Sequence, residues 1–277
     1  MKSDTVRWFN PERLNVLVFV LIFLGLIAYF FFSAQFGKEM FIRRIPGLSV
    51  IDEAVGRAAE TGKPILYIPG IFDMTDIQTV AGINILGHIA GKAAAYDSRL
   101  ICPMTRPFAM SVAQEVVKNS FLQAGKPDRY RAESVFYLTY DQLGFVAGVT
   151  GIMARELPST CFYLGAFKAE SLILAETGNH LGASQIAGTA EVSQIPFFIV
   201  TCDYTLIGEE LFAASAYLTR DSREVATLKG QDAIKGFIIA LIVLGSLLAT
   251  FSQPGSAWEN DTVDLTARKF MRFFQSD

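Results

Sequence analysis

The chain has little charge, little cysteine and little histidine. Charged residues make up 18% of its 277 residues, against about 25% in ordinary soluble proteins. The net charge is −3 and no long basic run occurs, which argues against binding to nucleic acid. The three cysteines are odd in number and lie in apolar stretches, so no disulfide framework is indicated. No cysteine pair has the spacing of a zinc or iron–sulfur site, and we expect neither a metal nor a cofactor.

Sequence signatures of catalysis are missing as well. No G-x-G-x-x-G and no G-x-x-x-x-G-K-[ST] occurs, which excludes two common phosphate-binding loops. The G-x-S-x-G turn of serine hydrolases is also absent. The two histidines, His88 and His180, are far apart in the sequence, and we expect them to be packed or hydrogen-bonded core residues rather than ligands. Enzymatic activity is therefore undecided, and the sequence favours a protein that is not an enzyme.

Two long stretches lack charge altogether. One runs from Leu14 to Gly37, and the other runs from Gly236 to Trp258 around an apolar centre at Phe237–Phe251. Because a helix of roughly 20 apolar residues spans the hydrocarbon of a bilayer, we expect a lipid bilayer as a partner. The bulky residues Phe30–Phe32 argue against a cleaved signal peptide, which requires small residues at its cleavage site. The predicted organisation is an N-terminal tail over 1–13, a transmembrane helix over 14–37, an α/β domain over 38–233, a second transmembrane helix over 234–254 and a C-terminal tail over 255–277.

The basic residues that flank the two spans give only a small preference for one orientation. Seven lie in the middle segment and six lie in the tails, and cytoplasmic loops carry the excess of such residues. Unpaired cysteines are also typical of a reducing compartment. We therefore predict that the middle domain lies in the cytoplasm.

Between the two spans, short apolar runs alternate with segments of helix length. Each run is β-branched or aromatic, too short for a helix and apolar on both faces, as in the central strands of a parallel sheet. Five repeats of this alternation predict an α/β fold with a doubly wound, mainly parallel, five-stranded Rossmann-like sheet. The expected strands are Pro64–Ile68, Arg99–Cys102, Ser134–Thr139, Thr160–Leu164 and Pro196–Cys202. The expected helices are Ser49–Thr61, Asp76–Tyr96, Pro107–Ala124, Asp141–Leu157, Glu170–Ala190 and Leu206–Leu218.

Polar side chains follow the ends of these expected strands. Ligands of open parallel sheets bind outside the carboxyl ends of the strands, so a mixture of acidic and basic residues there is a candidate site for a small polar ligand. The alternative is that these side chains cap the following helices and interact with the helix dipoles. No residue is assigned a catalytic role. The candidate ligand-binding residues are Asp73, Arg106, Asp141, Lys168, Glu170, Asp203, Thr205 and Glu209.

The expected helices are rich in glycine and poor in charge. Each glycine in a helix interior costs about 1 kcal/mol relative to alanine, so close approach of another backbone is the natural compensation. The neighbour is either the sheet of the same subunit or a helix of another copy, and exposed apolar helix faces usually mark an interface. The candidate packing positions are Gly87, Gly91, Gly144, Gly148, Gly178 and Gly182.

One stretch resembles a known family. Ile195–Glu210, followed by Ala213–Tyr217 and Gly230–Asp232, is similar to a prokaryotic family of membrane-anchored proteins of unknown function. The resemblance extends from about Arg44 to Ser252. It implies a bacterial or archaeal cell membrane, and it supplies no activity, ligand or catalytic residue.

Three functions are compatible with these features. The first is a membrane-anchored assembly or scaffold protein whose α/β domain self-associates or docks onto a partner complex. The second is a sensor of a small ligand or nucleotide, with or without enzymatic activity, that uses the carboxyl edge of the sheet. The third is an accessory subunit of a larger membrane complex. Plain spans, glycine-rich helices and the lack of a catalytic motif favour the first.

Overall fold

The computed structural model describes residues 14–35, 46–219 and 222–251. The predicted tails over 1–13 and 255–277, and the predicted ends of the two spans at 36–37 and 252–254, lie outside the described residues. The chain divides into two units. One contains the helices α1 and α9, and the other is an α/β body within Ile42–Asp221.

The helices α1 (Leu14–Gln35) and α9 (Ser222–Phe251) pack against each other within their unit. The rings of Phe23 and Phe237 meet edge to face, with 6.3 Å between their centroids. Both helices are long and apolar enough to cross a membrane, over 19 residues of α1 and 24 residues of α9. Helix α9 starts well before its uncharged part, so its first turns carry charged residues and only its later turns are wholly uncharged.

The α/β body is built on a parallel sheet of six strands. All five neighbouring pairs are parallel, and the strand order is β3-β2-β1-β4-β5-β6. This is the order of doubly wound dinucleotide-binding folds, in which the order of successive strands along the sheet reverses between β1 and β4. The strands are β1 (Ile65–Gly70), β2 (Leu100–Met104), β3 (Val135–Tyr137), β4 (Thr160–Ala166), β5 (Ser184–Thr189) and β6 (Tyr204–Ile207).

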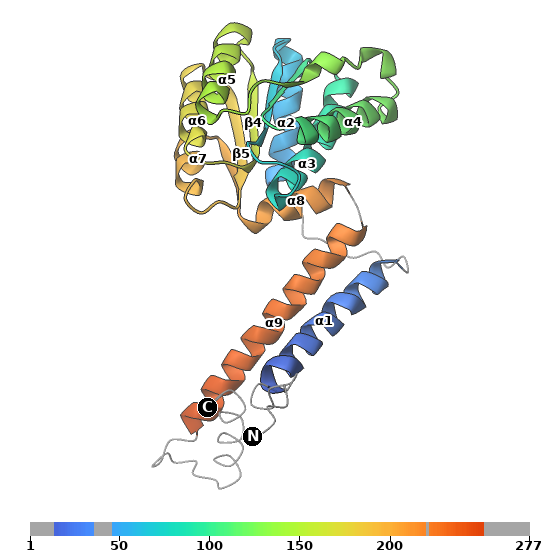
Figure 1. Cartoon of the computed structure of the whole chain (residues 1–277), viewed down its shortest axis with the longest axis vertical. Coiled ribbons are helices and arrows are strands. Elements are labelled where there is room, and N and C mark those ends of the chain that lie inside the picture. Colours follow the sequence, from blue (N-terminus) through green and yellow to red (C-terminus); the bar gives the residue numbers. More distant parts are fainter. Residues whose placement is uncertain (1–13, 36–45, 220–221, 252–277) are drawn as a thin grey trace, which may run out of the picture. The chain divides into compact units, whose positions relative to one another are not determined.

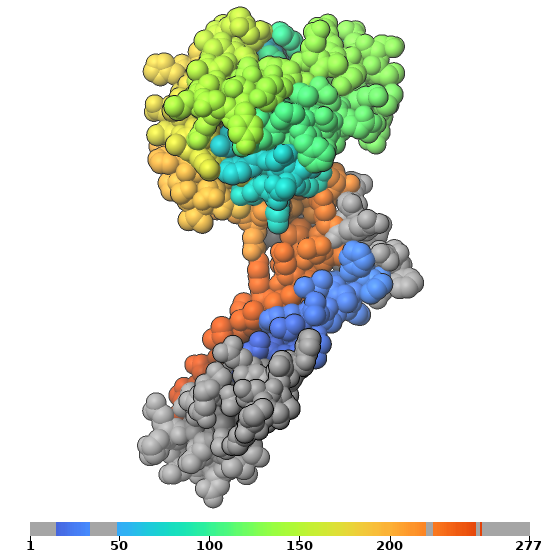
Figure 2. Space-filling model, in the orientation of Figure 1, coloured from blue at the N-terminus to red at the C-terminus, as the bar shows by residue number. Residues whose placement is uncertain are grey.

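Helices cover both faces of the sheet (Figure 1). One face packs against α2 (Pro46–Thr61), α3 (Ile77–Ala95), α4 (Pro107–Gln123) and α8 (Glu209–Thr219). The other face packs against α5 (Gln142–Glu156), α6 (Glu170–His180) and α7 (Ile195–Thr201). The strands β1, β2 and β4 are buried along their whole length, as expected for strands covered on both faces. Figure 2 shows the α/β body as closely packed segments coloured from cyan to orange.

The structure corrects the predicted sheet, which has six strands rather than five. The segment predicted as the last strand, Pro196–Cys202, is largely the helix α7. The segment predicted as one helix over Glu170–Ala190 contains both α6 and the strand β5. A further strand, β6, precedes the last helix of the body. The predicted α/β class and parallel strand direction are confirmed.

The strands β1 and β4 come unusually close together at their carboxyl ends. Gly70 has a φ of 89° and Gly165 a φ of 154°, a region that side chains rarely adopt. A Cβ on Gly70 would overlap the backbone of Ala166, and a Cβ on Gly165 would overlap the backbone of Pro69. The register between the two strands also shifts between Ile68 and Gly70. Glycine therefore allows the backbones of β1 and β4 to approach each other closely at the point where sheets of this order usually bind ligands.

Candidate functional site

The acids that follow β1 bond to backbone amides of their own loop. The Oδ1 atom of Asp73 accepts from the backbone N of Met74 at 2.8 Å. The Oδ1 atom of Asp76 accepts from the N of Gln78 at 2.8 Å and from the N of Thr79 at 3.3 Å. Asp76 therefore caps α3 and places a carboxylate at the helix end where this fold usually binds a phosphate. This arrangement disfavours a pyrophosphate at that position.

Arg106 connects the loops that follow three neighbouring strands. Its Nε donates to the carbonyl oxygen of Ile71 at 3.2 Å, and its Cζ lies 3.6 Å from the centroid of the Tyr140 ring. Thr105 donates to the same Ile71 oxygen at 3.0 Å. A cation over an exposed aromatic ring contributes about 0.5–1 kcal/mol to the stability of the folded state. Arg106 thus has a structural role in holding these loops together.

Glu170 is a buried acid beside an exposed lysine. Its Oε1 accepts from the backbone N of Lys168 at 2.6 Å, and its Oε2 accepts from Nε2 of Gln142 at 2.5 Å. Only 1% of Glu170 is exposed. The Nζ of Lys168 lies 5.1 Å from the centroid of the Phe72 ring. Nearby, Asp141 caps α5 by accepting from the N of Gly144 at 2.6 Å.

Five of the candidate residues therefore lie at the carboxyl edge of the sheet, where the sequence placed them: Asp73, Arg106, Asp141, Lys168 and Glu170. The acids among them are engaged by backbone amides or by an amide side chain. Glu209 also lies at this edge, because it begins α8 directly after β6. The helix-capping interpretation accounts for Asp76 and Asp141.

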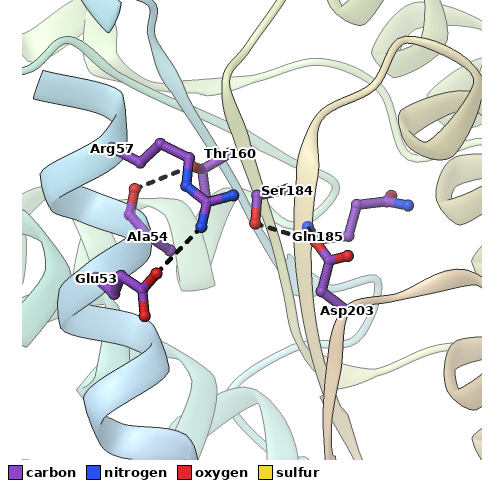
Figure 3. A network of polar contacts seen from close by, with 7 residues as sticks. All are labelled: Glu53, Ala54, Arg57, Thr160, Ser184, Gln185 and Asp203. Carbon is purple, nitrogen blue, oxygen red and sulfur yellow. Dashed lines mark hydrogen bonds and ion pairs between the residues drawn. The ribbon is translucent and has the colours of Figure 1, made fainter. Parts of the chain in front are cut away.

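Asp203 lies at the opposite, amino edge of the sheet, because it precedes β6 instead of following a strand. Its Oδ2 accepts from Oγ of Ser184 at 3.0 Å and from the backbone N of Gln185 at 2.8 Å (Figure 3). At the same edge, Thr160 of β4 donates to the carbonyl oxygen of Ala54 in α2 at 3.0 Å. The placement of Asp203 with the carboxyl-edge residues was wrong, since it depended on reading α7 as a strand.

Thr205 also lies away from the carboxyl edge. It sits inside β6, and its Oγ1 is buried with no hydrogen-bond partner among the residues that the structure describes. Asp203 and Thr205 therefore do not join the other candidate residues in one site.

Most of the candidate packing glycines contact their own subunit. A Cβ on Gly87 would come within 2.9 Å of Cγ1 of Val116 in α4, and one on Gly148 would come within 2.6 Å of Cδ2 of Leu138. Gly144 adjoins Asp141, the residue that caps its helix. Gly182 follows α6 with a φ of 68°, which explains that glycine by its backbone conformation.

Gly178 makes room for a buried polar network. A Cβ there would overlap Oε1 of Gln185. That oxygen accepts from the hydroxyl of Tyr163 at 3.0 Å. The Nε2 of Gln185 donates to the carbonyl oxygens of Ala175 and Thr201, each at 2.9 Å. The side chain of Gln185 is thus fully engaged inside the face covered by α6 and α7.

Gly91 differs from Gly87, Gly144, Gly148 and Gly178, because among the described residues no atom outside its own helix backbone lies within 4 Å of the position of a Cβ. It lines a groove of about 620 Å³ between α3, α4 and the end of α8. His88 and Lys92 line the same groove and contact Oδ1 of Asp52, with distances of 3.2 Å from Nε2 and 3.4 Å from Nζ. His88 is therefore paired with a carboxylate instead of being packed in the core.

The three cysteines are free thiols. Burial raises the pKa of Cys161 to about 12 and that of Cys202 to about 12. It also raises the pKa of Cys102 above its usual range. The thiolate is the reactive form of cysteine, so these thiols are poor nucleophiles in the folded protein.

The α7 surface, which we define as Val192, Phe197, Ile199 and Val200, is a feature that the sequence did not reveal. Ile199 is 53% exposed and Val200 is 84% exposed. Within α7 only Phe198 is buried, where its ring contacts Tyr163 and Phe167. A strand buried on both faces would have hidden these residues, so the exposed apolar surface follows directly from the helical conformation.

The chain belongs to a family of unknown function, because the model of DUF6754, a domain of unknown function, matches residues 4–259. The match is longer than the stretch on which the sequence resemblance was based. No curated protein and no solved structure matches the chain.

Proposed function

We propose that this chain is a membrane-anchored assembly protein whose α/β body associates with further copies through the α7 surface. The observation that carries the proposal is the exposure of apolar side chains there: Val192 is 77% exposed, Ile199 53% and Val200 84%. Large apolar patches on soluble domains usually mark interaction sites. Full burial of each such side chain between two copies contributes about 1.5–3 kcal/mol to the free energy of association.

A second copy of this chain is the partner that we propose for the α7 surface. No charged residue occurs from Val192 to Cys202, so two copies that meet there bring no like charges together at its centre. Most homo-oligomers use the same patch on both subunits in a two-fold arrangement. Anchoring in one bilayer also raises the effective concentration of copies for each other.

The anchors in this proposal are α1 and α9, which hold the α/β body at the cytoplasmic surface of a bacterial or archaeal membrane. The length and apolar character of both helices support anchoring. The small excess of basic residues in the middle segment and the three free thiols support the cytoplasmic side.

The sensor hypothesis draws less support from the carboxyl edge. The acids Asp73 and Asp141 bond to amides of their own turns, and Glu170 is held by Lys168 and Gln142. Asp203 belongs to the other edge of the sheet. A site for a polar ligand would have to rest mainly on Arg106 and Lys168.

The mass of the purified full-length protein in mild detergent and in lipid nanodiscs tests the proposal. Light scattering corrected for bound detergent should give a multiple of the 30.4 kDa chain mass. A monodisperse monomer at micromolar concentration would contradict self-association. Co-purification of unrelated chains in fixed ratio would instead favour an accessory subunit of a larger complex.

A further inference from the structure

A small cavity of about 160 Å³ lies at the amino edge of the sheet, near the start of β2. It is enclosed by the end of α3, the end of α4 and the 3-10 helices η2 (Pro127–Arg129) and η3 (Ala132–Ser134). Its polar lining consists of Asp97, Ser98, Arg99, Arg129, Arg131 and Ser134. Three arginines and one aspartate are therefore among the residues that line this small space.

More cations than acids take part in the ion pairs around this cavity. Asp97 is shared by Arg129, at 3.4 Å from Nη2 to Oδ2, and by Lys126, at 3.9 Å from Nζ to Oδ1. Arg99 pairs with Glu156 at 2.8 Å, and Arg155 engages the same carboxylate at 3.2 Å.

Four cations thus share the two carboxylates of Asp97 and Glu156. The hydrogen bond from Arg155 and the charge of Arg99 lower the pKa of Glu156, as expected for a carboxylate between two arginines. Arg131 adds a further charge, and it has no acidic partner among the described residues.

A buried hydroxyl at the cavity also lacks a partner. The Oγ of Ser98 is buried and makes no hydrogen bond within the described residues. An unsatisfied buried hydroxyl costs about 1–3 kcal/mol, and such groups in native proteins usually have a partner. A rotation of the Ser98 side chain toward the cavity would let this hydroxyl donate to an acceptor oxygen supplied from outside the chain.

We infer that this cavity binds one small tetrahedral oxyanion of the phosphate class. Arginine is the side chain best suited to phosphate, because its planar donors match pairs of phosphate oxygens. The volume of about 160 Å³ is equivalent to about five water molecules. It is smaller than the roughly 300–1,000 Å³ of sites for drug-sized ligands. The site therefore suits a single phosphate group instead of a whole nucleotide.

The phosphate group has two possible sources, which are free inorganic phosphate and the headgroup of an anionic lipid. Both present the same oxygens to the arginines. The full-length protein in nanodiscs distinguishes them. One arm adds inorganic phosphate to nanodiscs of phosphatidylcholine, at ionic strength held constant with chloride. The other arm omits phosphate and mixes phosphatidylglycerol into the nanodisc.

Thermal unfolding is the measurement, because a ligand that binds the folded state raises the Tm. In the first arm the Tm should rise by about 3–6 °C at phosphate concentrations about ten times the Kd. Arg131→Gln should weaken phosphate binding about tenfold, which is the effect of losing one charge-assisted contact. Ser98→Ala should also weaken binding, while leaving the Tm without phosphate unchanged or raised, since Ser98 Oγ has no partner to lose in the described part of the chain.

Arg57→Gln is the matched control. Arg57 is an exposed arginine of α2 whose one ion pair within the described part of the chain is with Glu53, at 3.2 Å, and its loss should leave the phosphate response intact. A response confined to the lipid arm and lost in Arg131→Gln assigns the site to a headgroup. A wild-type Tm that responds in neither arm overturns the inference, and so does a response that Arg131→Gln leaves unchanged.

Discussion

The carboxylate of Asp203 accepts a hydrogen bond from the backbone N–H of Gln185, with 2.8 Å between Oδ2 and N. The same oxygen accepts from the hydroxyl of Ser184 at 3.0 Å. These contacts join the loop before β6, the last strand of the sheet, to the first residues of β5. Asp203 therefore stabilises the pairing of an edge strand at its amino end.

Replacement of Asp203 by alanine should destabilise the α/β body by about 1–3 kcal/mol, because the amide of Gln185 loses its charged acceptor. Chemical unfolding followed by circular dichroism measures this loss. Glu176→Ala is the control, since Glu176 is an exposed acid of α6 and its loss should change stability by less than about 0.5 kcal/mol. If the two variants were equally stable, the structural role assigned to Asp203 would be wrong.

Replacement of Gly178 by alanine should also destabilise the protein, against the usual benefit of alanine in a helix. The new Cβ would overlap Oε1 of Gln185 and force apart a network that is fully hydrogen-bonded. We expect a loss of about 1–3 kcal/mol, as for other overpacked cores.

Gly151→Ala is the matched control, because Gly151 is also helical and, among the described residues, no atom outside its own helix backbone lies within 4 Å of the position of its Cβ. It should raise stability by about 0.4–1 kcal/mol. A stabilising Gly178→Ala would show that Gln185 moves aside without cost.

The segment from α6 to α7 shows where prediction from the sequence fails. The apolar run Pro196–Cys202 was read as a strand because a short run without polar interruptions does not distinguish a buried strand from a helix. The signal against a strand was Pro196, which lacks the amide proton that a central strand needs. Proline fits the first turn of a helix, where it lies in α7.

The strand β5 was missed for the opposite reason. Its sequence Ser184–Thr189 contains alanine and glycine, which have low strand propensity. It forms a strand because it is buried between β4 and β6 and because Gln185 finds partners across the core. Such long-range partners are not visible in a local pattern. Gly182, with its φ of 68°, marked the break between the helix and the strand.

The strands β1, β2 and β4 and their helices were predictable, because short apolar runs that alternate with helix-length segments are typical of a parallel sheet covered on both faces. The carboxyl-edge residues after those strands were placed at the correct edge for the same reason. The predicted position of Asp203 depended on the assignment of the segment before it. Because Pro196–Cys202 was predicted as a strand, Asp203 was assigned to the carboxyl edge instead of the amino edge. The cavity at Arg131 lies between loops and helix ends, and no sequence pattern predicts how these are arranged in space.

The three thiols should resist alkylation in the folded protein. Only the thiolate reacts, and a pKa of about 12 for Cys161 and Cys202 leaves only about 10⁻⁴ of each as thiolate at pH 8. Iodoacetamide at pH 8 should therefore label none of the three within minutes, whereas all three should be labelled after unfolding in denaturant. Mass spectrometry counts the labels, and rapid labelling of the native Cys202 would indicate that this thiol is accessible and ionised.

Stability should decrease as the pH rises above about 9. The ordinary pKa of a cysteine is 9.0, and in the folded state that of Cys161 is about 12. Since the folded state disfavours the thiolate, the stability from each protonated thiol is complete below pH 9 and is lost as the pH rises toward 12. Each such thiol should contribute a slope of about −1.4 kcal/mol per pH unit in that interval.

Cys161→Ala removes one of these groups, so the decrease in stability between pH 9 and pH 11 should become shallower by about the contribution of one thiol. Unfolding by denaturant at a series of pH values measures the slope. A slope that is the same in both proteins would show that Cys161 ionises equally in the folded and unfolded states.

The α7 surface gives the most direct test of assembly. Ile199→Ser together with Val200→Ser removes two exposed apolar side chains without altering the buried Phe198. Each side chain buried between copies contributes about 1.5–3 kcal/mol, so the double variant should weaken association at least tenfold and shift the mass in nanodiscs toward the monomer.

Leu122→Ser is the control for this double variant. Leu122 is 50% exposed and belongs to α4, whereas Ile199 is 53% exposed and lies on the opposite face of the sheet. The control should retain the mass of the wild type. If instead Leu122→Ser dissociates the assembly and the α7 variant does not, the contact between copies lies on the face covered by α3 and α4, where the groove beside Gly91 is open.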